Sequence, residues 1–145
     1  MKNSKNKIFR RFSVAIILVF SGLILSGIQG CKKYPDGDLI NLESRTERVA
    51  NTWKVDLCHI NDVDYTSWYI TYSEIFTKAG AYSFQWGGNP GSGTWAFQNN
   101  DLEIRITGSG NTQSVTLFIL KLEEMQFWYY YMDGNDKKVF HMSQQ

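Results

Sequence analysis

The feature that most constrains the fold of this chain is an alternation of apolar and polar residues that begins near Thr52 and continues almost to the C-terminus. Residues 82–86 read Y-S-F-Q-W and residues 102–107 read L-E-I-R-I-T, so that every second side chain is apolar. A period of two gives a β-strand one buried face and one face towards water. The sequence therefore predicts a domain built from β-strands.

Stretches rich in Gly, Asn and Asp divide this region into eight segments. The predicted strands are residues 52–60, 67–77, 80–86, 93–98, 101–107, 112–122, 126–132 and 137–143. An open meander would leave unpaired strand edges, whereas a closed barrel has none. We therefore predict an all-β fold, a small antiparallel eight-stranded barrel. Eight strands leave an interior that side chains fill or that holds one small ligand.

Two segments indicate departures from a regular antiparallel meander. Residues 112–122 are apolar at both odd and even positions, which indicates either a bulge or a strand covered on both faces. Residues 43–51 predict one short N-terminal helix, because Ser44 and Glu47 form a capping-box pattern and Asn51 suits a left-handed position at the C-terminal end. We expect this helix to lie as a lid over one end or one side of the barrel.

The first 31 residues are organised differently. Five Lys and Arg residues and no acid precede an apolar run at residues 12–28, which is shorter than the roughly 20 residues that a membrane-spanning helix needs. The tetrapeptide Ile28-Gln29-Gly30-Cys31 resembles the lipobox of bacterial lipoproteins. The resemblance implies that residues 1–30 are a signal peptide that is removed, and that Cys31 is acylated, for example with palmitate. The alternative is an uncleaved membrane anchor with an incidental cysteine.

The remaining chain then divides into a lipidated cysteine with a polar tether, residues 31–42, and a barrel domain, residues 43–145. Ten basic and fourteen acidic residues remain after residue 30, a net charge of about −4, which argues against a nucleic-acid partner. The membrane is the expected partner through the lipid. No acid-rich stretch follows Cys31, so we expect the periplasmic face of the outer membrane by default, with exposure at the cell surface as the alternative. Cys58 is left without a disulfide partner and is expected to be buried.

The order of strand and turn motifs carries a second resemblance. The motifs are W-K-V at residues 53–55, F-T-K-A-G-A-Y-S-F at 76–84, G-S-G-T-W-A-F at 91–97, L-E-I-R-I at 102–106 and I-L-K-L at 119–122. Together they resemble the lipocalin-like domains of small Bacteroidota lipoproteins, a family mostly without assigned activity, which implies a small antiparallel barrel. Asn51-Thr52-Trp53 resembles the G-x-W of true lipocalins with Asn in place of Gly. Lys137 and Lys138 stand where those proteins have a late arginine.

The sequence contains no motif of nucleophilic catalysis, phosphate binding or dinucleotide binding. We therefore predict no enzymatic activity and no cofactor. The segment 58–64, read C-H-I-N-D-V-D, has residue types that bind metals but not the convergent spacing that zinc needs. Asp133-Gly134-Asn135-Asp136 is typical of a hairpin turn and lacks the further oxygens of a calcium loop. We predict no metal site.

Aromatic residues, 15% of the chain, are the strongest functional signal. Alternation along residues 126–132 directs Tyr129 to one face and both Trp128 and Tyr130, the outer-face candidates, to the other. The ligand-lining candidates are Trp53, Tyr82, Phe84, Trp86, Trp95, Phe97 and Tyr129. Such an interior favours the binding of a small apolar or semi-polar ligand without catalysis. We expect the protein to be a monomer. The alternative is a filled barrel whose outer aromatics bind a protein or a glycan. A cavity of roughly 300 Å³ or more would favour the ligand.

Overall fold

The computed structural model describes residues 33–36 and 43–145, and both the predicted signal peptide and Cys31 lie outside these residues. Within the described part of the chain, none of the helices has the length and apolar character required to cross a bilayer.

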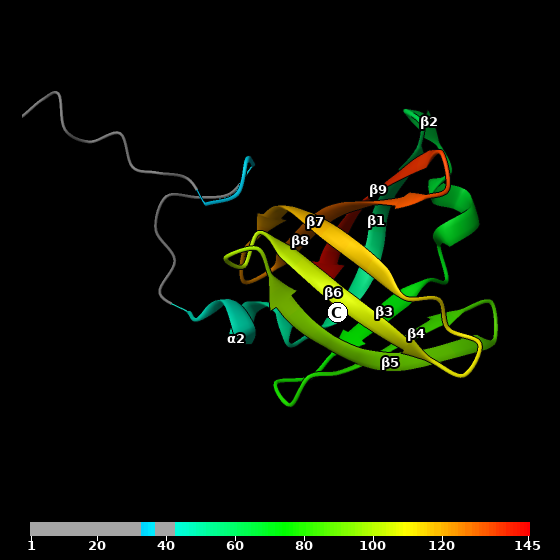
Figure 1. Ribbon diagram of the computed structural model, residues 1–145. Coiled ribbons are helices and arrows are strands. Elements are labelled where there is room, and N and C mark those ends of the chain that lie inside the picture. The colour runs from blue at the N-terminus through cyan, green and yellow to red at the C-terminus, as the bar shows by residue number, and fades with distance from the viewer. Residues whose placement is uncertain (1–32, 37–42) are drawn as a thin grey trace, which may run out of the picture. The chain divides into compact units, whose positions relative to one another are not determined.

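Eight antiparallel strands form a closed barrel (Figure 1). They are β1 (Thr52–Ile60), β3 (Ser73–Phe76), β4 (Ala81–Trp86), β5 (Asn89–Gln98), β6 (Glu103–Ser109), β7 (Val115–Leu122), β8 (Gln126–Asp133) and β9 (Asp136–Gln144). Each strand pairs with its neighbour, and β9 closes the barrel by pairing with β1 from Trp53 to Ile60. A two-residue strand, β2 (Val63–Asp64), pairs with the end of β1. The predicted eight-stranded barrel is confirmed.

The segment 67–72 is not a strand, contrary to the sequence prediction. It contains a 3₁₀ helix, η1 (Thr66–Tyr69), followed by a turn, and β3 begins only at Ser73. The Asp64 carboxylate accepts a hydrogen bond of 2.8 Å from the Thr66 backbone N–H, and the Thr66 hydroxyl accepts one of 3.0 Å from the Cys58 N–H. These local side-chain bonds replace the bonds of a strand ladder.

Strand β5 is longer than predicted, since it includes Pro90 and Gly91, which the sequence pattern placed in a turn. Gly87 and Gly88, with φ values of +53° and +86°, are enough to make the hairpin turn. Gly91 lies directly under the ring of Phe84, and a Cβ atom at this position would be 2.0 Å from Phe84 Cε1. The absence of a side chain at position 91 therefore lets Phe84 lie against the inner face of β5.

The predicted helix is confirmed as α2 (Arg45–Val49), and both hydrogen bonds of the Ser44–Glu47 capping box are present. The left-handed conformation predicted for Asn51 is wrong, because Asn51 does not have a positive φ. The chain must enter β1 directly, and the Asn51 side chain instead donates to the Arg48 carbonyl and accepts from Gln144 Nε2. The helix covers one end of the barrel: Trp53 Nε1 donates to the Val49 carbonyl over 2.9 Å.

Residues 112–122, which are apolar at both odd and even positions, contain a bulge, one of the two arrangements predicted for this segment. The register between β7 and β8 shifts between Ile119 and Lys121. Leu117 and Ile119 are buried before the shift, and Leu122 is buried after it. The extra residue therefore returns the end of β7 to the core.

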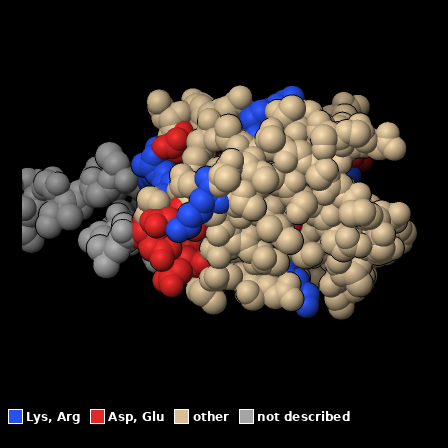
Figure 2. Space-filling model, turned by 90° about the horizontal axis from the view of Figure 1, so that it is seen from below, with Lys and Arg blue, Asp and Glu red and all other residues tan. Residues whose placement is uncertain are grey.

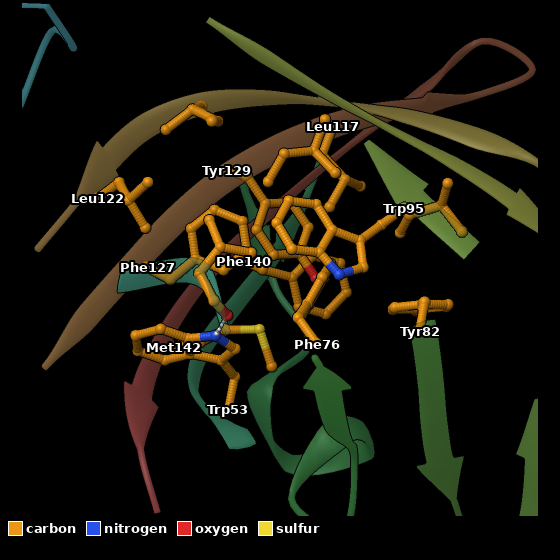
Figure 3. Close-up of a cluster of buried hydrophobic side chains, with 14 of the residues drawn as sticks. Trp53, Phe76, Tyr82, Trp95, Leu117, Leu122, Phe127, Tyr129, Phe140 and Met142 are labelled. Carbon is orange, nitrogen blue, oxygen red and sulfur yellow. Dashed lines mark hydrogen bonds between the residues drawn. The ribbon is translucent and has the colours of Figure 1, made fainter. Parts of the chain in front are cut away.

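The half of the barrel next to α2 is filled by side chains. Figure 3 shows that buried residues from strands all round the barrel meet in this cluster. Trp53 and Phe127 have exposed fractions of 0%, and their ring centroids are 5.6 Å apart. The half of the interior next to α2 is therefore a packed core.

Part of the predicted tether is packed against the barrel. Tyr34 is 4% exposed, and its hydroxyl donates to the Asp101 carbonyl over 2.9 Å. The Asp36 N–H donates to the Leu120 carbonyl over 2.9 Å. Lys33 and Arg45 both form ion pairs with Asp101, and Figure 2 shows charged side chains gathered at this end of the visible face.

Candidate ligand-binding site

A cavity of about 240 Å³ occupies the half of the barrel that lies away from α2. It is lined by Tyr69, Tyr72, Glu74, Tyr82, Phe84, Trp86, Ile106, Thr112, Gln113, Val115, Leu117, Tyr131, Asp133 and Lys138. Strand β4 ends at Trp86 and β8 ends at Asp133, whereas α2 lies beside the start of β1. Because neighbouring strands are antiparallel, the last residues of β4 and β8 lie at the end of the barrel opposite α2 (Figure 1). Trp86 and Asp133, which line the cavity, are therefore at that end.

The base of the cavity holds a buried carboxylate, Glu74, which is 2% exposed. Three tyrosine hydroxyls donate to it: Tyr72 and Tyr82 to Oε1 over 2.7 and 2.8 Å, and Tyr129 to Oε2 over 2.9 Å. These residues come from β3, β4, β8 and the turn before β3. The cluster links three strands across the interior and satisfies both oxygens of the carboxylate.

Burial raises the pKa of Glu74 above its ordinary value, and the hydrogen bonds from Tyr72, Tyr82 and Tyr129 oppose this rise by stabilising the ionised form. Burial, followed by the nearby charge of Glu74, raises the pKa values of all three tyrosines. Their hydroxyls therefore stay protonated and keep donating at physiological pH.

The mouth of the cavity has aromatic walls and one ion pair. Tyr69 stacks on Trp86 with ring centroids 4.9 Å apart, and Trp86 Nε1 donates to the Trp68 carbonyl over 3.1 Å. Lys138 Nζ lies 2.6 Å from a carboxylate oxygen of Asp133. The 3₁₀ helix η1, which replaced a predicted strand, thus contributes a wall of the cavity through Tyr69.

The seven ligand-lining candidates fall into three groups. Tyr82, Phe84 and Trp86 line the cavity, and Tyr129 lies at its base through Glu74. Trp53 and Trp95 belong to the packed core, where their indole N–H groups donate to backbone carbonyls of Val49 and Thr77. Phe97 packs against Trp95 and lines a separate shallow depression beside α2.

Sequence reasoning missed Glu74 and Lys138, although the strand period held a signal for both. Glu74 has the same parity as the buried Phe76 on β3, and Lys138 has the same parity as the buried Phe140 on β9. Within a strand, residues two apart share a face. The sequence therefore already indicated that these two charged side chains face the interior of the barrel.

The outer-face candidates lie on a partly exposed band over β7, β8 and β9. Trp128 stacks on His141 with ring centroids 4.0 Å apart, and Lys121 Nζ lies 4.7 Å from the Trp128 ring centroid. Tyr130 stacks on Phe118 at 4.8 Å. These contacts fix the rings in place and leave part of each accessible.

The segment 58–64 does not gather metal ligands. Cys58 is buried, and burial raises its thiol pKa to about 11, whereas the neighbouring His59 is partly exposed on the opposite parity of β1. Within residues 33–36 and 43–145, no group of three or more His, Cys, Asp or Glu side chains is placed to hold a metal ion.

Comparison with known proteins adds no assignment to this geometry, since no protein-family model and no curated protein sequence matches the chain.

Proposed function

We propose that this protein is a lipid-anchored envelope lipoprotein whose barrel binds a small semi-polar ligand without catalysis. The observation that carries the ligand proposal is the cavity of about 240 Å³, which combines aromatic walls with a polar base. Its volume is somewhat below the roughly 300 Å³ at which common ligand pockets begin. The ligand is therefore a small molecule, held in one half of a barrel whose other half is packed.

Filling the cavity is the direct test of ligand binding. Val115 lines the cavity from β7, so Val115→Trp should block it and abolish capture of any ligand that co-purifies with the wild-type protein. The matched control is Thr107→Trp, an exposed position on the neighbouring strand β6, which should retain the ligand. Native and denaturing mass spectrometry of the purified proteins measures the bound mass. Equal bound mass in both variants would contradict binding in this cavity.

The lipoprotein part of the proposal rests on Ile28-Gln29-Gly30-Cys31 and places the protein in the outer membrane, facing the periplasm. Cys31→Ala should abolish acylation and release the protein from the membrane fraction in bacterial cells. Cys58→Ala is the matched control and should leave acylation unchanged, because Cys58 is buried within the barrel. Metabolic labelling with an alkyne fatty acid reads out both variants. Continued labelling of Cys31→Ala would refute lipidation at this residue.

The outer aromatic band supports a second candidate function, the binding of a protein or a glycan. Its favouring observation is that Trp128 and Tyr130 lie side by side on one strand, each partly exposed and stacked on a neighbour. Exposed aromatic faces can stack on sugar rings or dock a partner. On this view Tyr130→Ala should weaken partner capture and lower the unfolding midpoint only slightly. A large stability loss, measured by thermal unfolding, would assign Tyr130 to packing instead.

A further inference from the structure

We propose that the cavity selects small molecules that carry a protonated amine, with the ammonium group directed towards Glu74. This inference rests on the proposed ligand-binding function and names the chemical class of the ligand. The proposal is argued from a buried carboxylate at the base of the cavity. Tyrosine oxygens surround this carboxylate, and aromatic rings line the cavity above it.

The hydrogen-bonding capacity of the base is the first argument. A tyrosine hydroxyl has a single proton, and those of Tyr72, Tyr82 and Tyr129 all point to Glu74. What these hydroxyls still offer to another molecule is their lone pairs. An ionised carboxylate is also an acceptor only. The base of the cavity therefore suits a ligand group that donates hydrogen bonds, as an ammonium does.

The charges around the cavity point the same way. Three charged side chains line it, and two of them, Asp133 and Lys138, form an ion pair of 2.6 Å at the mouth. Their charges offset each other, so the ionised form of Glu74, to which all three tyrosine hydroxyls can donate, leaves the lining with a net negative charge. A cation at the base would supply the missing counter-charge, whereas an anionic ligand would meet a buried like charge.

The walls supply the rest of the recognition. Tyr69 and Tyr72 meet edge to face with centroids 5.8 Å apart, and Tyr72 meets Trp86 in the same way at 6.4 Å. Such an arrangement offers both ring faces, which attract cations, and apolar surface for the body of a ligand. A carboxylate combined with aromatic rings is an arrangement suited to organic cations.

The test uses three probes that share a phenyl ring on a short chain: 2-phenylethylamine, 2-phenylethanol and 3-phenylpropionate. Isothermal titration calorimetry on the purified protein near neutral pH should show the amine binding about tenfold or more tighter than the alcohol, a difference typical of one favourable charge interaction. The propionate should bind weakest of the three. This series needs no variant and depends only on the charge of the probe.

Glu74→Gln removes the charge and keeps the size of the side chain. The preference for the amine over the alcohol should then shrink to about two- to fivefold, since only the attraction of the aromatic walls for the cation remains. The matched control is Glu124→Gln, an exposed residue in the loop before β8, which should keep the full preference.

The outcomes separate this inference from the function on which it rests. Similar affinities for all three probes, or a preference for the propionate, would overturn selectivity for amines and leave small-ligand binding in place. Failure of all three probes to bind would overturn both. Full preference for the amine in a folded Glu74→Gln variant would overturn the role of Glu74. If that variant does not fold, the titrations of the wild-type protein with the three probes decide whether the cavity selects amines.

Discussion

Trp53→Ala should lower the free energy of unfolding by about 3–5 kcal/mol, the usual cost of truncating a large buried aromatic. Trp53 has an exposed fraction of 0%, packs against Phe127 and donates its indole N–H to the Val49 carbonyl. The substitution therefore opens a hole in the packed half of the barrel and also releases α2 from β1. Urea unfolding followed by circular dichroism measures the loss.

Trp68→Ala is the matched control, because Trp68 is 71% exposed on the 3₁₀ helix η1. Its unfolding free energy should stay within about 0.5 kcal/mol of the wild-type value. An unchanged midpoint for Trp53→Ala, with an intact Trp68→Ala control, would place Trp53 outside the core and contradict the packing described here.

Glu74→Ala should destabilise the barrel by about 2–6 kcal/mol. Each buried polar group that is left without a partner costs about 1–3 kcal/mol, and two of the three hydroxyls that donate to Glu74 belong to the buried Tyr82 and Tyr129. Glu124→Ala, at an exposed position, should have almost no effect. Equal unfolding free energies for these two alanine variants would show that the tyrosines do not depend on Glu74.

The same carboxyl predicts a pH dependence of stability. Because the folded-state pKa of Glu74 is raised by burial, the folded protein holds this proton more tightly than the unfolded chain does. The stabilisation from protonation is full below the ordinary Glu pKa of about 4.3 and is lost as the pH rises through the folded-state value. Wild-type stability relative to Glu74→Gln should therefore fall from acid towards neutral pH. A difference that does not change with pH would contradict the raised pKa.

Most of the fold was predictable because local pattern and global closure agree. The period of two in β4, β6 and β8 leaves one face for the core, and closure follows from the need to pair the edges. Two of the failures arose where a side chain bonds to the backbone of a residue two or three positions away. Asp64 bonds to the Thr66 backbone at the start of η1, which replaces the first part of the strand predicted over residues 67–77. Asn51 bonds to the Arg48 carbonyl through its side chain and does not adopt a left-handed backbone.

The site was less predictable, because it depends on which inward positions are filled. The alternation along β4 predicted that Tyr82, Phe84 and Trp86 face the interior. It could not predict which end of the barrel is filled by side chains and which end holds a cavity. That difference comes from side-chain volume across strands: β5 presents Trp95 to the closed half and Gly91 to the open half. Glu74 was within reach of the same parity argument, whereas two of its tyrosine partners, Tyr82 and Tyr129, lie on other strands that meet it only in the folded barrel.

The docking of Tyr34 holds residues 33–36 against the α2 end of the barrel. Its hydroxyl bonds to Asp101, in the loop between β5 and β6 at the α2 end. Cys31 is three residues earlier, at most about 10 Å along an extended chain. With a lipid on Cys31, the packed end of the barrel would rest close to the bilayer and the cavity would open into the aqueous compartment. A ligand would then be taken from solution rather than out of the lipid, which is the route open to a water-soluble amine such as the one proposed.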